Sequence, residues 1–261
     1  YNNWRRSTTG GGLFTFSNIT SDNTGRFINP ADYDDNLNIL YAAKTSTVIK
    51  RISNMTGSYS STDVSVSSLG ATPTHIRVSP YTTSSSTLFV GANSDVYKVT
   101  NANGTPTVTK ITPTSFPTGA ISCVEIGASE NELLVTFSSY GGSEVYYTSN
   151  GGTSWVDKSG NLPDMPIRWA LFNPKDRKEV IVATELGVWS TANITASTPV
   201  WAASNNGLAN TRVDMLQYRA SDSLIMASTH GRGAFTGRFK SAVSNAPVVS
   251  FTSSKDTICV G

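Results

Sequence analysis

The chain has 261 residues, of which 38% are hydrophobic and only 15% are charged, and its formal net charge is +2. This length can bury a large core, and Ser, Thr, Asn and Gly must cover most of the surface, which favours an extracellular or cell-surface location. No Lys/Arg cluster follows a groove and no apolar run is long enough to span a bilayer, so neither nucleic acid binding nor membrane insertion is expected.

Short apolar runs recur along the chain, and each ends in a small residue. Successive runs end 49, 45, 47 and 44 residues apart. A fixed period of about 40–50 residues is typical of a β-propeller. The runs are Ile39–Ala42, Leu88–Gly91, Leu133–Thr136, Val180–Ala183 and Leu224–Ala227.

A second series of segments precedes these runs and keeps step with them, with spacings of 50, 48, 46 and 46 residues. Each repeat is read as a first strand, a buried second strand, a third strand such as Val96–Val99 or Gly187–Trp189, and a fourth. Four short antiparallel strands make a blade. We therefore predict an all-β propeller of four-stranded blades, about five of them visible, with repeats starting near residues 25, 75, 121, 167 and 213.

The octapeptide Thr148–Trp155 reads Thr-Ser-Asn-Gly-Gly-Thr-Ser-Trp. Asn150 can bond its own backbone, the two glycines tolerate positive φ, and the following hydroxyls can bond back across the turn. The segment resembles the Asp-box, or BNR repeat, S/T-x-D/N-x-G-x-S/T-W, of sialidase-like, sortilin-like and xyloglucanase-like propellers. The resemblance implies an architecture and a structural role for Thr148, Asn150, Gly152, Ser154 and Trp155.

The two ends of the propeller region, residues 1–239, both indicate incomplete blades. Ser7–Phe14 lies along the motif as a degenerate copy with Thr9 in place of Asn, so residues 1–20 form a partial first blade. Met215–Phe239 supplies only three strands, and we expect the closing strand of that blade to come from elsewhere. These features favour a segment of a longer propeller.

Beyond Phe239 the repeat pattern stops. Residues 240–246 read as a linker, and residues 247–261 resemble the opening of a PKD-type immunoglobulin-like domain. This resemblance implies a large secreted surface protein of Bacteroidetes-type bacteria with further domains on the same polypeptide. Two cysteines, Cys123 and Cys259, form no metal-ligand spacing.

Propeller ligands usually occupy the channel mouth, where second-to-third-strand loops and blade-to-blade loops meet. His230 and Arg232 in Ser228–Phe235 form a polar pair in one interpretation, and in the other Arg232 braces a neighbouring blade. A set of basic residues precedes or begins the first strands: Arg26, Arg168 and Arg212, with His75 and Arg77. They would suit a carboxylate or sulfate, or else brace adjacent blades. No F/Y-R-I-P signature accompanies them.

Carboxylates offer few catalytic candidates, because Glu185 and Asp214 lack an evident partner for glycoside hydrolysis. We therefore assign no catalytic residue and no cofactor. Asp32, Asp34 and Asp35 cluster in a first-to-second-strand turn, where a solvated turn is the simpler interpretation and a calcium clip is the alternative.

Most aromatic residues fall in strand patterns and are read as core, whereas Tyr140 precedes Gly141-Gly142 in a loop and is expected to be exposed. The preferred hypothesis is a non-catalytic binding or spacing module of a secreted bacterial surface protein, adhesin-like, with a glycan or another surface protein as partner. The alternatives are a glycoside hydrolase, xyloglucanase-like or sialidase-like, with its carboxylates in further blades, and sortilin-like peptide binding.

Overall fold

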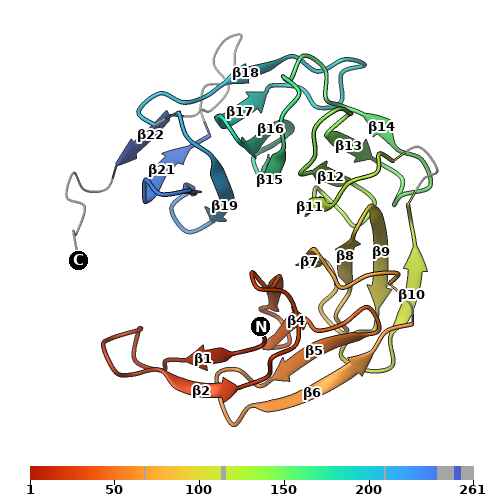
Figure 1. Ribbon diagram of the computed structural model, residues 1–261, viewed down its shortest axis with the longest axis vertical. Helices are drawn as coiled ribbons and strands as arrows, with labels where there is room; N and C mark the ends of the chain where they lie inside the picture. Colours follow the sequence, from red (N-terminus) through yellow and green to blue (C-terminus); the bar gives the residue numbers. More distant parts are fainter. Residues whose placement is uncertain (68, 113–115, 209, 240–249, 254–261) are drawn as a thin grey trace. The chain divides into compact units, whose positions relative to one another are not determined.

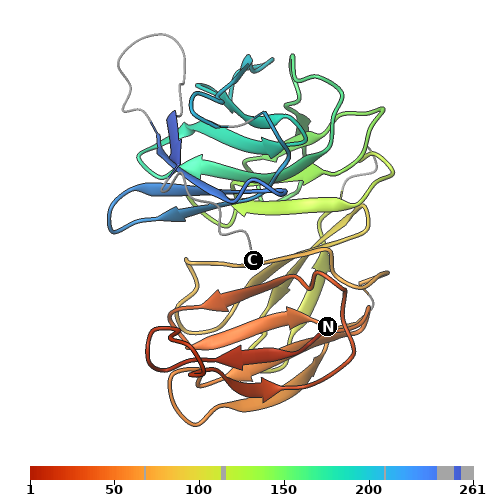
Figure 2. The same cartoon turned by 60° about the vertical axis from the view of Figure 1, so that its left-hand side comes forward.

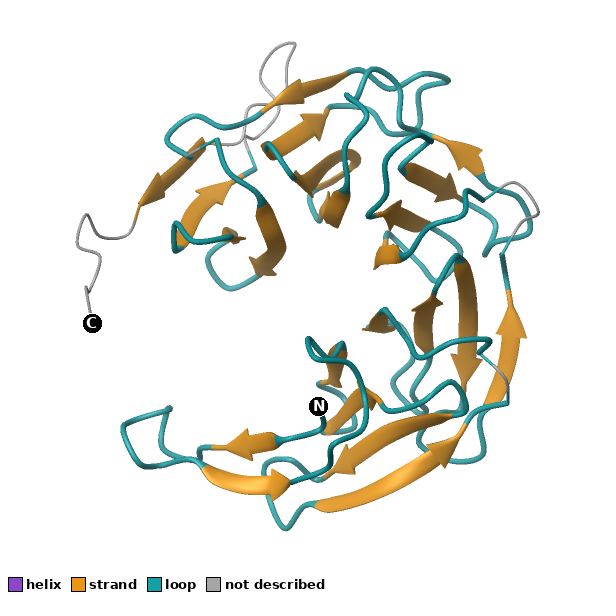
Figure 3. Cartoon of the chain, viewed as in Figure 1, coloured by secondary structure: helices purple, strands orange, loops and turns teal. Residues whose placement is uncertain are grey.

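The computed structural model describes residues 1–67, 69–112, 116–208, 210–239 and 250–253, the last range by its backbone alone. Within these residues every regular element is a β-strand, and strands alternate with loops (Figure 3). They form one two-stranded sheet and five four-stranded sheets, each with its strands side by side in chain order (Figure 1). The predicted fold class, an all-β propeller of four-stranded antiparallel blades, is confirmed. The described residues contain no helix that could cross a membrane.

The chain divides into two compact units, Tyr1–Val124 and Glu125–Gly261, and the boundary falls inside strand β11. Unit 1 begins with a half-blade, the antiparallel pair of β1 (Trp4–Arg6) and β2 (Ser17–Thr20). Two complete blades follow, and Figure 2 shows their strands running side by side. Blade 1 is β3 (Ala31–Asp34), β4 (Ile39–Ala43), β5 (Val48–Ser53) and β6 (Ser60–Ser65), and blade 2 is β7 (His75–Val78), β8 (Leu88–Ala92), β9 (Asp95–Thr100) and β10 (Thr107–Lys110).

Blade 3 begins in unit 1 and continues in unit 2, which also holds blades 4 and 5. Blade 3 is β11 (Ile121–Ile126), β12 (Leu133–Phe137), β13 (Val145–Thr148) and β14 (Val156–Asp157). Blade 4 is β15 (Ile167–Asn173), β16 (Asp176–Thr184), β17 (Gly187–Thr191) and β18 (Trp201–Ala203), and blade 5 is β19 (Val213–Arg219), β20 (Leu224–Thr229), β21 (Ala234–Arg238) and β22 (Ser250–Ser253).

The second strands of the blades are the apolar runs seen in the sequence. Every residue of β8 and β12 is buried, which requires cover on both faces of the strand and explains why hydrophobicity is continuous there instead of alternating. The fourth strands β10 and β14 are mostly or wholly exposed. Burial therefore falls across a blade from its second strand to its fourth.

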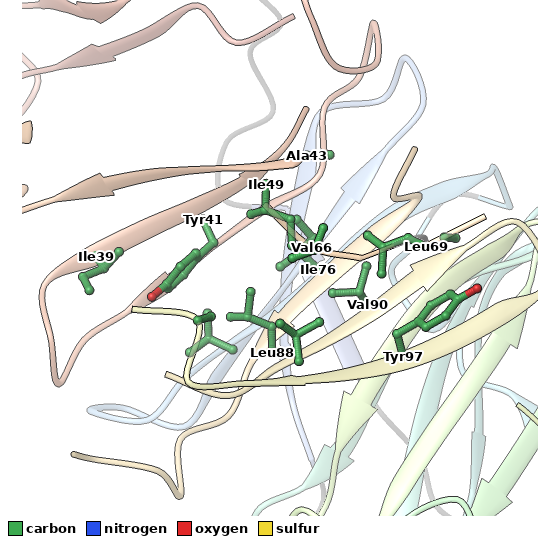
Figure 4. Packing of buried hydrophobic residues seen from close by; sticks show 14 residues of the cluster. Ile39, Tyr41, Ala43, Ile49, Val66, Leu69, Ile76, Leu88, Val90 and Tyr97 are labelled. Atoms are coloured by element: carbon green, nitrogen blue, oxygen red, sulfur yellow. The ribbon is translucent and has the colours of Figure 1, made fainter. Parts of the chain in front are cut away.

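Blades 1 and 2 share one hydrophobic core within unit 1. Tyr41 and Ile49 of blade 1 pack with Ile76, Leu88 and Val90 of blade 2 (Figure 4). Strands β3 and β4 both contact β7. Since a single blade cannot bury both of its faces, this shared core is what stabilises each of the two sheets.

Blades 4 and 5 are joined in the same way within unit 2. Leu171, Ile181 and Val188 of blade 4 pack with Leu216 and Ile225 of blade 5. Strands β15 and β16 both contact β19. The repeat in sequence thus produces a repeat in packing, with the apolar second strands at its centre.

Residues 213–239 supply three strands of the last blade, and the closing strand that the sequence left unassigned comes from further along the same chain. Ser250–Ser253 pairs antiparallel with β21, Thr252 opposite Thr236 and Phe251 opposite Gly237, so that blade 5 has a fourth strand from its own chain. A strand that follows a break in the repeat carries no signal of which edge it will join. The linker 240–246, Cys259 and most of the PKD-like segment lie outside the described residues, so that assignment stays a prediction.

Candidate functional site

The octapeptide Thr148–Trp155 forms the turn between β13 and β14 and bonds mainly to itself. The Asn150 carboxamide oxygen accepts the Ser154 amide N–H at 3.0 Å, and its nitrogen donates to the Ser154 hydroxyl at 2.8 Å. The Thr148 hydroxyl accepts the Gly152 amide N–H at 3.2 Å. The polar residues that resemble an Asp-box are therefore engaged inside the turn.

The degenerate segment Ser7–Phe14, between β1 and β2, keeps part of this arrangement. The Ser7 hydroxyl accepts the amide N–H groups of Thr9 at 3.3 Å and Gly11 at 3.0 Å, as the threonine hydroxyl does in blade 3. Thr9 has no carboxamide to hold the far side of the turn. Phe14, at the tryptophan position, is fully exposed with a φ of 61°.

Blade 4 contains a related turn that the sequence pattern did not reveal. The Asn193 carboxamide oxygen accepts the Thr195 amide N–H at 3.1 Å and its hydroxyl at 2.7 Å. Trp201 follows this asparagine by eight residues, whereas Trp155 follows Asn150 by five, so the motif spacing is broken. Trp201 is 2% exposed and its indole N–H donates to a backbone carbonyl at 2.9 Å, so it belongs to the core and does not stack on a ligand.

In unit 1, arginine side chains brace one blade against the next. The Arg26 guanidinium donates to the carbonyl oxygens of Thr72 and Pro73, both at 2.7 Å. Arg51 of blade 1 donates to the carbonyl oxygen of Asn103 in blade 2. Arg26 therefore follows the bracing interpretation, because its donors are committed to the backbone.

In unit 2, the arginines at or just before the start of the first strands of blades 4 and 5 are paired with carboxylates. Arg168 Nε lies 2.8 Å from Glu185 Oε1, and Arg212 Nε lies 2.6 Å from Asp214 Oδ1. His230 Nδ1 lies 3.3 Å from the other oxygen of Asp214. These pairs bind Glu185 and Asp214 to arginines and not to a second carboxyl, and they offset the positive charge that an anionic ligand would require.

Arg232 lies in a tight loop between β20 and β21. The Thr229 amide and hydroxyl both donate to the Gly233 carbonyl, at 2.9 and 2.6 Å, and Gly231 and Gly233 have φ values of 84° and 77°. Arg232 is exposed, and within the described chain its guanidinium neither braces a blade nor pairs with His230. His230 contacts Asp214 instead.

His75 is not a cationic group of the kind expected at this position. It is 4% exposed, and its Nδ1 accepts the Val124 amide N–H at 3.2 Å. Burial, with a smaller effect from the charge of Arg77, lowers the pKa of His75 to about 3. The imidazole is therefore neutral at physiological pH.

Asp32 and Asp34 lie in β3, and only Asp35 lies in the turn where the sequence had placed all three aspartates. Asp34 is 1% exposed, and its carboxylate accepts the amide N–H groups of Asn36 and Leu37 at 3.0 Å and the Ser86 hydroxyl at 2.6 Å. Asp32 accepts the Val78 amide N–H at 2.8 Å. No group of three His, Cys, Asp or Glu side chains in the described residues is arranged to hold a metal ion. The carboxylates of Asp32 and Asp34 therefore support the turn and the neighbouring blade.

The loop between β12 and β13 presents an aromatic side chain on a braced backbone. Tyr140 is 68% exposed. The Gly141 amide N–H donates to Asp164 Oδ1 at 2.7 Å, and the Ser143 hydroxyl donates to Asp157 Oδ2 at 2.5 Å. The side chain is therefore available to a partner, while the residues that follow it in the loop are anchored by hydrogen bonds.

Glu144, at the end of the same loop, was missed in the sequence as a titrating group. It is 2% exposed; burial raises its pKa to about 7, the Ser139 hydroxyl at 3.2 Å opposes the shift, and the charge of Asp164 adds to it. Its Oε1 is buried with no hydrogen-bond partner among the described residues. A glutamate in a loop is normally exposed, so the sequence alone does not predict the burial of Glu144. That burial is set by residues distant in the chain.

Neither a protein-family model nor a curated protein matches the chain, whereas solved structures resemble it. The Cps50 (Swd1) β-propeller domain of Myceliophteria thermophila has a TM-score of 0.63 at 8% identity, with 89% of this chain and 72% of that one covered. A chain of a mitotic checkpoint complex gives 0.56 at 12% identity, covering 82% and 60%. An ancestral GH74 enzyme gives 0.60 at 15% identity, covering 86% and 31%. At these identities the likeness concerns the propeller fold.

Proposed function

We propose that this chain is a non-catalytic glycan-binding module. The observation that carries the proposal is Tyr140, an exposed aromatic ring on a loop whose backbone and side chains are anchored by hydrogen bonds to Asp164 and Asp157. Such a ring offers a large apolar face with a polar tip. A loop that is already ordered loses little conformational freedom when a ligand binds, which favours affinity.

The carboxyl groups support binding without cleavage. Glycoside hydrolysis needs two carboxyls about 5–9.5 Å apart on either side of the scissile bond, both within reach of the substrate. Glu185 and Asp214 are paired with arginines, and Glu144 is buried. These three carboxyls are thus engaged in ion pairs or withdrawn from the surface.

A glycoside hydrolase is the second candidate, with catalytic carboxylates in further blades. The structural likeness to a GH74 enzyme is compatible with it at the level of the fold.

We place the module in a secreted bacterial cell-surface protein, adhesin-like and followed by PKD-like domains. The low charge and the high content of hydroxyl and amide side chains support this location, as does the resemblance to an Asp-box propeller. Another surface protein is the alternative partner.

An array of neutral and acidic polysaccharides, probed with wild type and Tyr140→Ala, tests the proposal. Loss of a central aromatic contact typically costs more than about 1 kcal/mol, so we expect binding to weaken roughly tenfold. Tyr81→Ala, which truncates another exposed tyrosine (46% exposed), is the matched control and should bind as wild type does. Equal binding by wild type and Tyr140→Ala would remove the observation on which the proposal rests.

A further inference from the structure

A pocket of about 380 Å³ lies in unit 2 between blades 4 and 5. Its walls come from the first-to-second-strand turns of both blades and from the end of β21. The turn of blade 4 contributes Asn173, Lys175 and Asp176, and the turn of blade 5 contributes Tyr218 and Ser223. Because Tyr140 lies in a second-to-third-strand loop, the pocket is at the other end of the strands.

Two aromatic rings form the apolar part of this pocket. Tyr218 and Phe239 have ring centroids 6.2 Å apart and ring planes tilted by 50°. Both are only partly buried. Both rings pack against the core that blades 4 and 5 share, and the part of each ring that stays exposed is available to a ligand.

Two cationic groups lie beside these rings. Lys175 is exposed, and its ammonium has no partner among the described residues. The Arg238 guanidinium makes one long hydrogen bond, 3.4 Å, to the backbone carbonyl of Asp222. The Asp222 carboxylate makes its two side-chain hydrogen bonds to Arg219, at 2.9 and 2.7 Å, and the charge of Arg238 has only a smaller effect on it.

Acceptors for hydroxyl groups complete the lining. Asp176 uses one carboxylate oxygen to accept the Lys178 amide N–H at 3.1 Å, which leaves the second oxygen available. Ser223 adds a hydroxyl. Asn173 is fixed in place, since its oxygen accepts the Lys175 amide N–H at 2.9 Å and its nitrogen donates to Glu179 at 2.5 Å.

We propose that this pocket binds a sugar acid of the hexuronate type. The sugar carboxylate bonds to Lys175 and Arg238, one pyranose face lies on Tyr218 and Phe239, and ring hydroxyls donate to Asp176. A guanidinium beside an ammonium matches a carboxylate, and the pocket volume is at the lower end of the range of about 300–1,000 Å³ for small-ligand sites. The inference rests on the proposed glycan-binding function and adds a ligand class and a second site to it.

Titration calorimetry with sodium D-glucuronate tests the site, with D-glucose and sodium acetate as the neutral and the sugar-free probes. We expect binding of glucuronate and at most weak binding of the other two. Arg238→Gln and Lys175→Gln are surface changes that keep the fold. Loss of a charge-assisted hydrogen bond should weaken glucuronate binding about tenfold or more. Lys178→Gln makes the same charge change next to the pocket and should leave affinity unchanged.

Several results would overturn the site: no glucuronate binding, equal binding of glucose or acetate, or the same loss in Lys178→Gln as in Arg238→Gln. The experiments distinguish failure of this site from failure of the proposed function. If binding on the polysaccharide array depends on Tyr140 while glucuronate does not bind, the glycan-binding function is supported and the glucuronate site is wrong. If glucuronate binding depends on Arg238 while Tyr140→Ala leaves polysaccharide binding unchanged, the glucuronate site is supported and the role of Tyr140 is wrong.

Discussion

At the scale of single residues, one carboxamide holds the outer turn of blade 3. Asn150 bonds both the amide and the hydroxyl of Ser154 and receives the Thr148 hydroxyl at 2.8 Å. The corresponding residue of the half-blade, Thr9, makes a single long side-chain contact, 3.4 Å, to Ser7. The two turns are therefore a natural pair for measuring what the asparagine contributes.

Asn150→Ala should lower the free energy of unfolding by roughly 1–3 kcal/mol, because it removes several hydrogen bonds that close a turn. Thr9→Ala should lower it by less than about 0.5 kcal/mol. Urea unfolding followed by tryptophan fluorescence measures both values. Equal losses would show that the asparagine bonds contribute nothing beyond those of the hydroxyl turn.

Glu144 predicts a pH dependence of stability. Its pKa is raised from 4.5 to about 7 in the folded chain. Below pH 4.5 both folded and unfolded forms carry the proton, and there is no penalty. As pH rises toward 7 the unfolded form ionises first, so wild type loses up to about 3 kcal/mol relative to Glu144→Gln, with the full loss above pH 7.

Urea unfolding at pH 4.5 and pH 8 measures this difference. The stability of Glu144→Gln relative to wild type should increase between the two pH values. Asp35→Asn, at an exposed carboxyl, is the control and should show no comparable change. If Glu144→Gln and wild type lose stability in parallel, the carboxyl is not held in its neutral form.

At the scale of strands, the sequence predicts the buried second strands well, because continuous apolar runs such as Leu88–Ala92 have few alternative structures. The sequence predicts poorly which side chains will contact each other. Arg168 and Glu185 are 17 residues apart, and Tyr218 and Phe239 are 21 apart, so only the folded blades bring these side chains together. The Arg168–Glu185 ion pair and the pocket therefore had no local signal.

The fourth strand of blade 5 is the element that the sequence did not indicate. Thr252→Pro removes a backbone donor and disfavours pairing with β21, so the amides of Ala234–Arg238 should exchange faster with deuterium. Thr252→Val keeps the backbone N–H and should exchange as wild type does. Unchanged exchange in Thr252→Pro would mean that Ser250–Ser253 does not cover this edge in solution.

At the scale of the whole molecule, the repeat period and the turn chemistry are enough to predict a propeller of four-stranded blades, and the structure has that fold. The sequence determines function less well than fold, because arginines at or before the first strands of different blades bond to different groups. Arg26 bonds backbone carbonyls, whereas Arg168 and Arg212 pair with carboxylates. These arginines suggest an anion-binding site in the sequence, but in the structure most of their hydrogen bonds go to other groups of the protein.

The central claim is that the chain binds glycans without cleaving them. Mass spectrometry of xyloglucan oligosaccharides and of sialyllactose after prolonged incubation with the wild-type chain tests it most directly, since these probes represent the two hydrolase classes considered. We predict that every saccharide is recovered at its original mass. Shortened oligosaccharides or free sialic acid, formed in proportion to the amount of chain added, would contradict the claim.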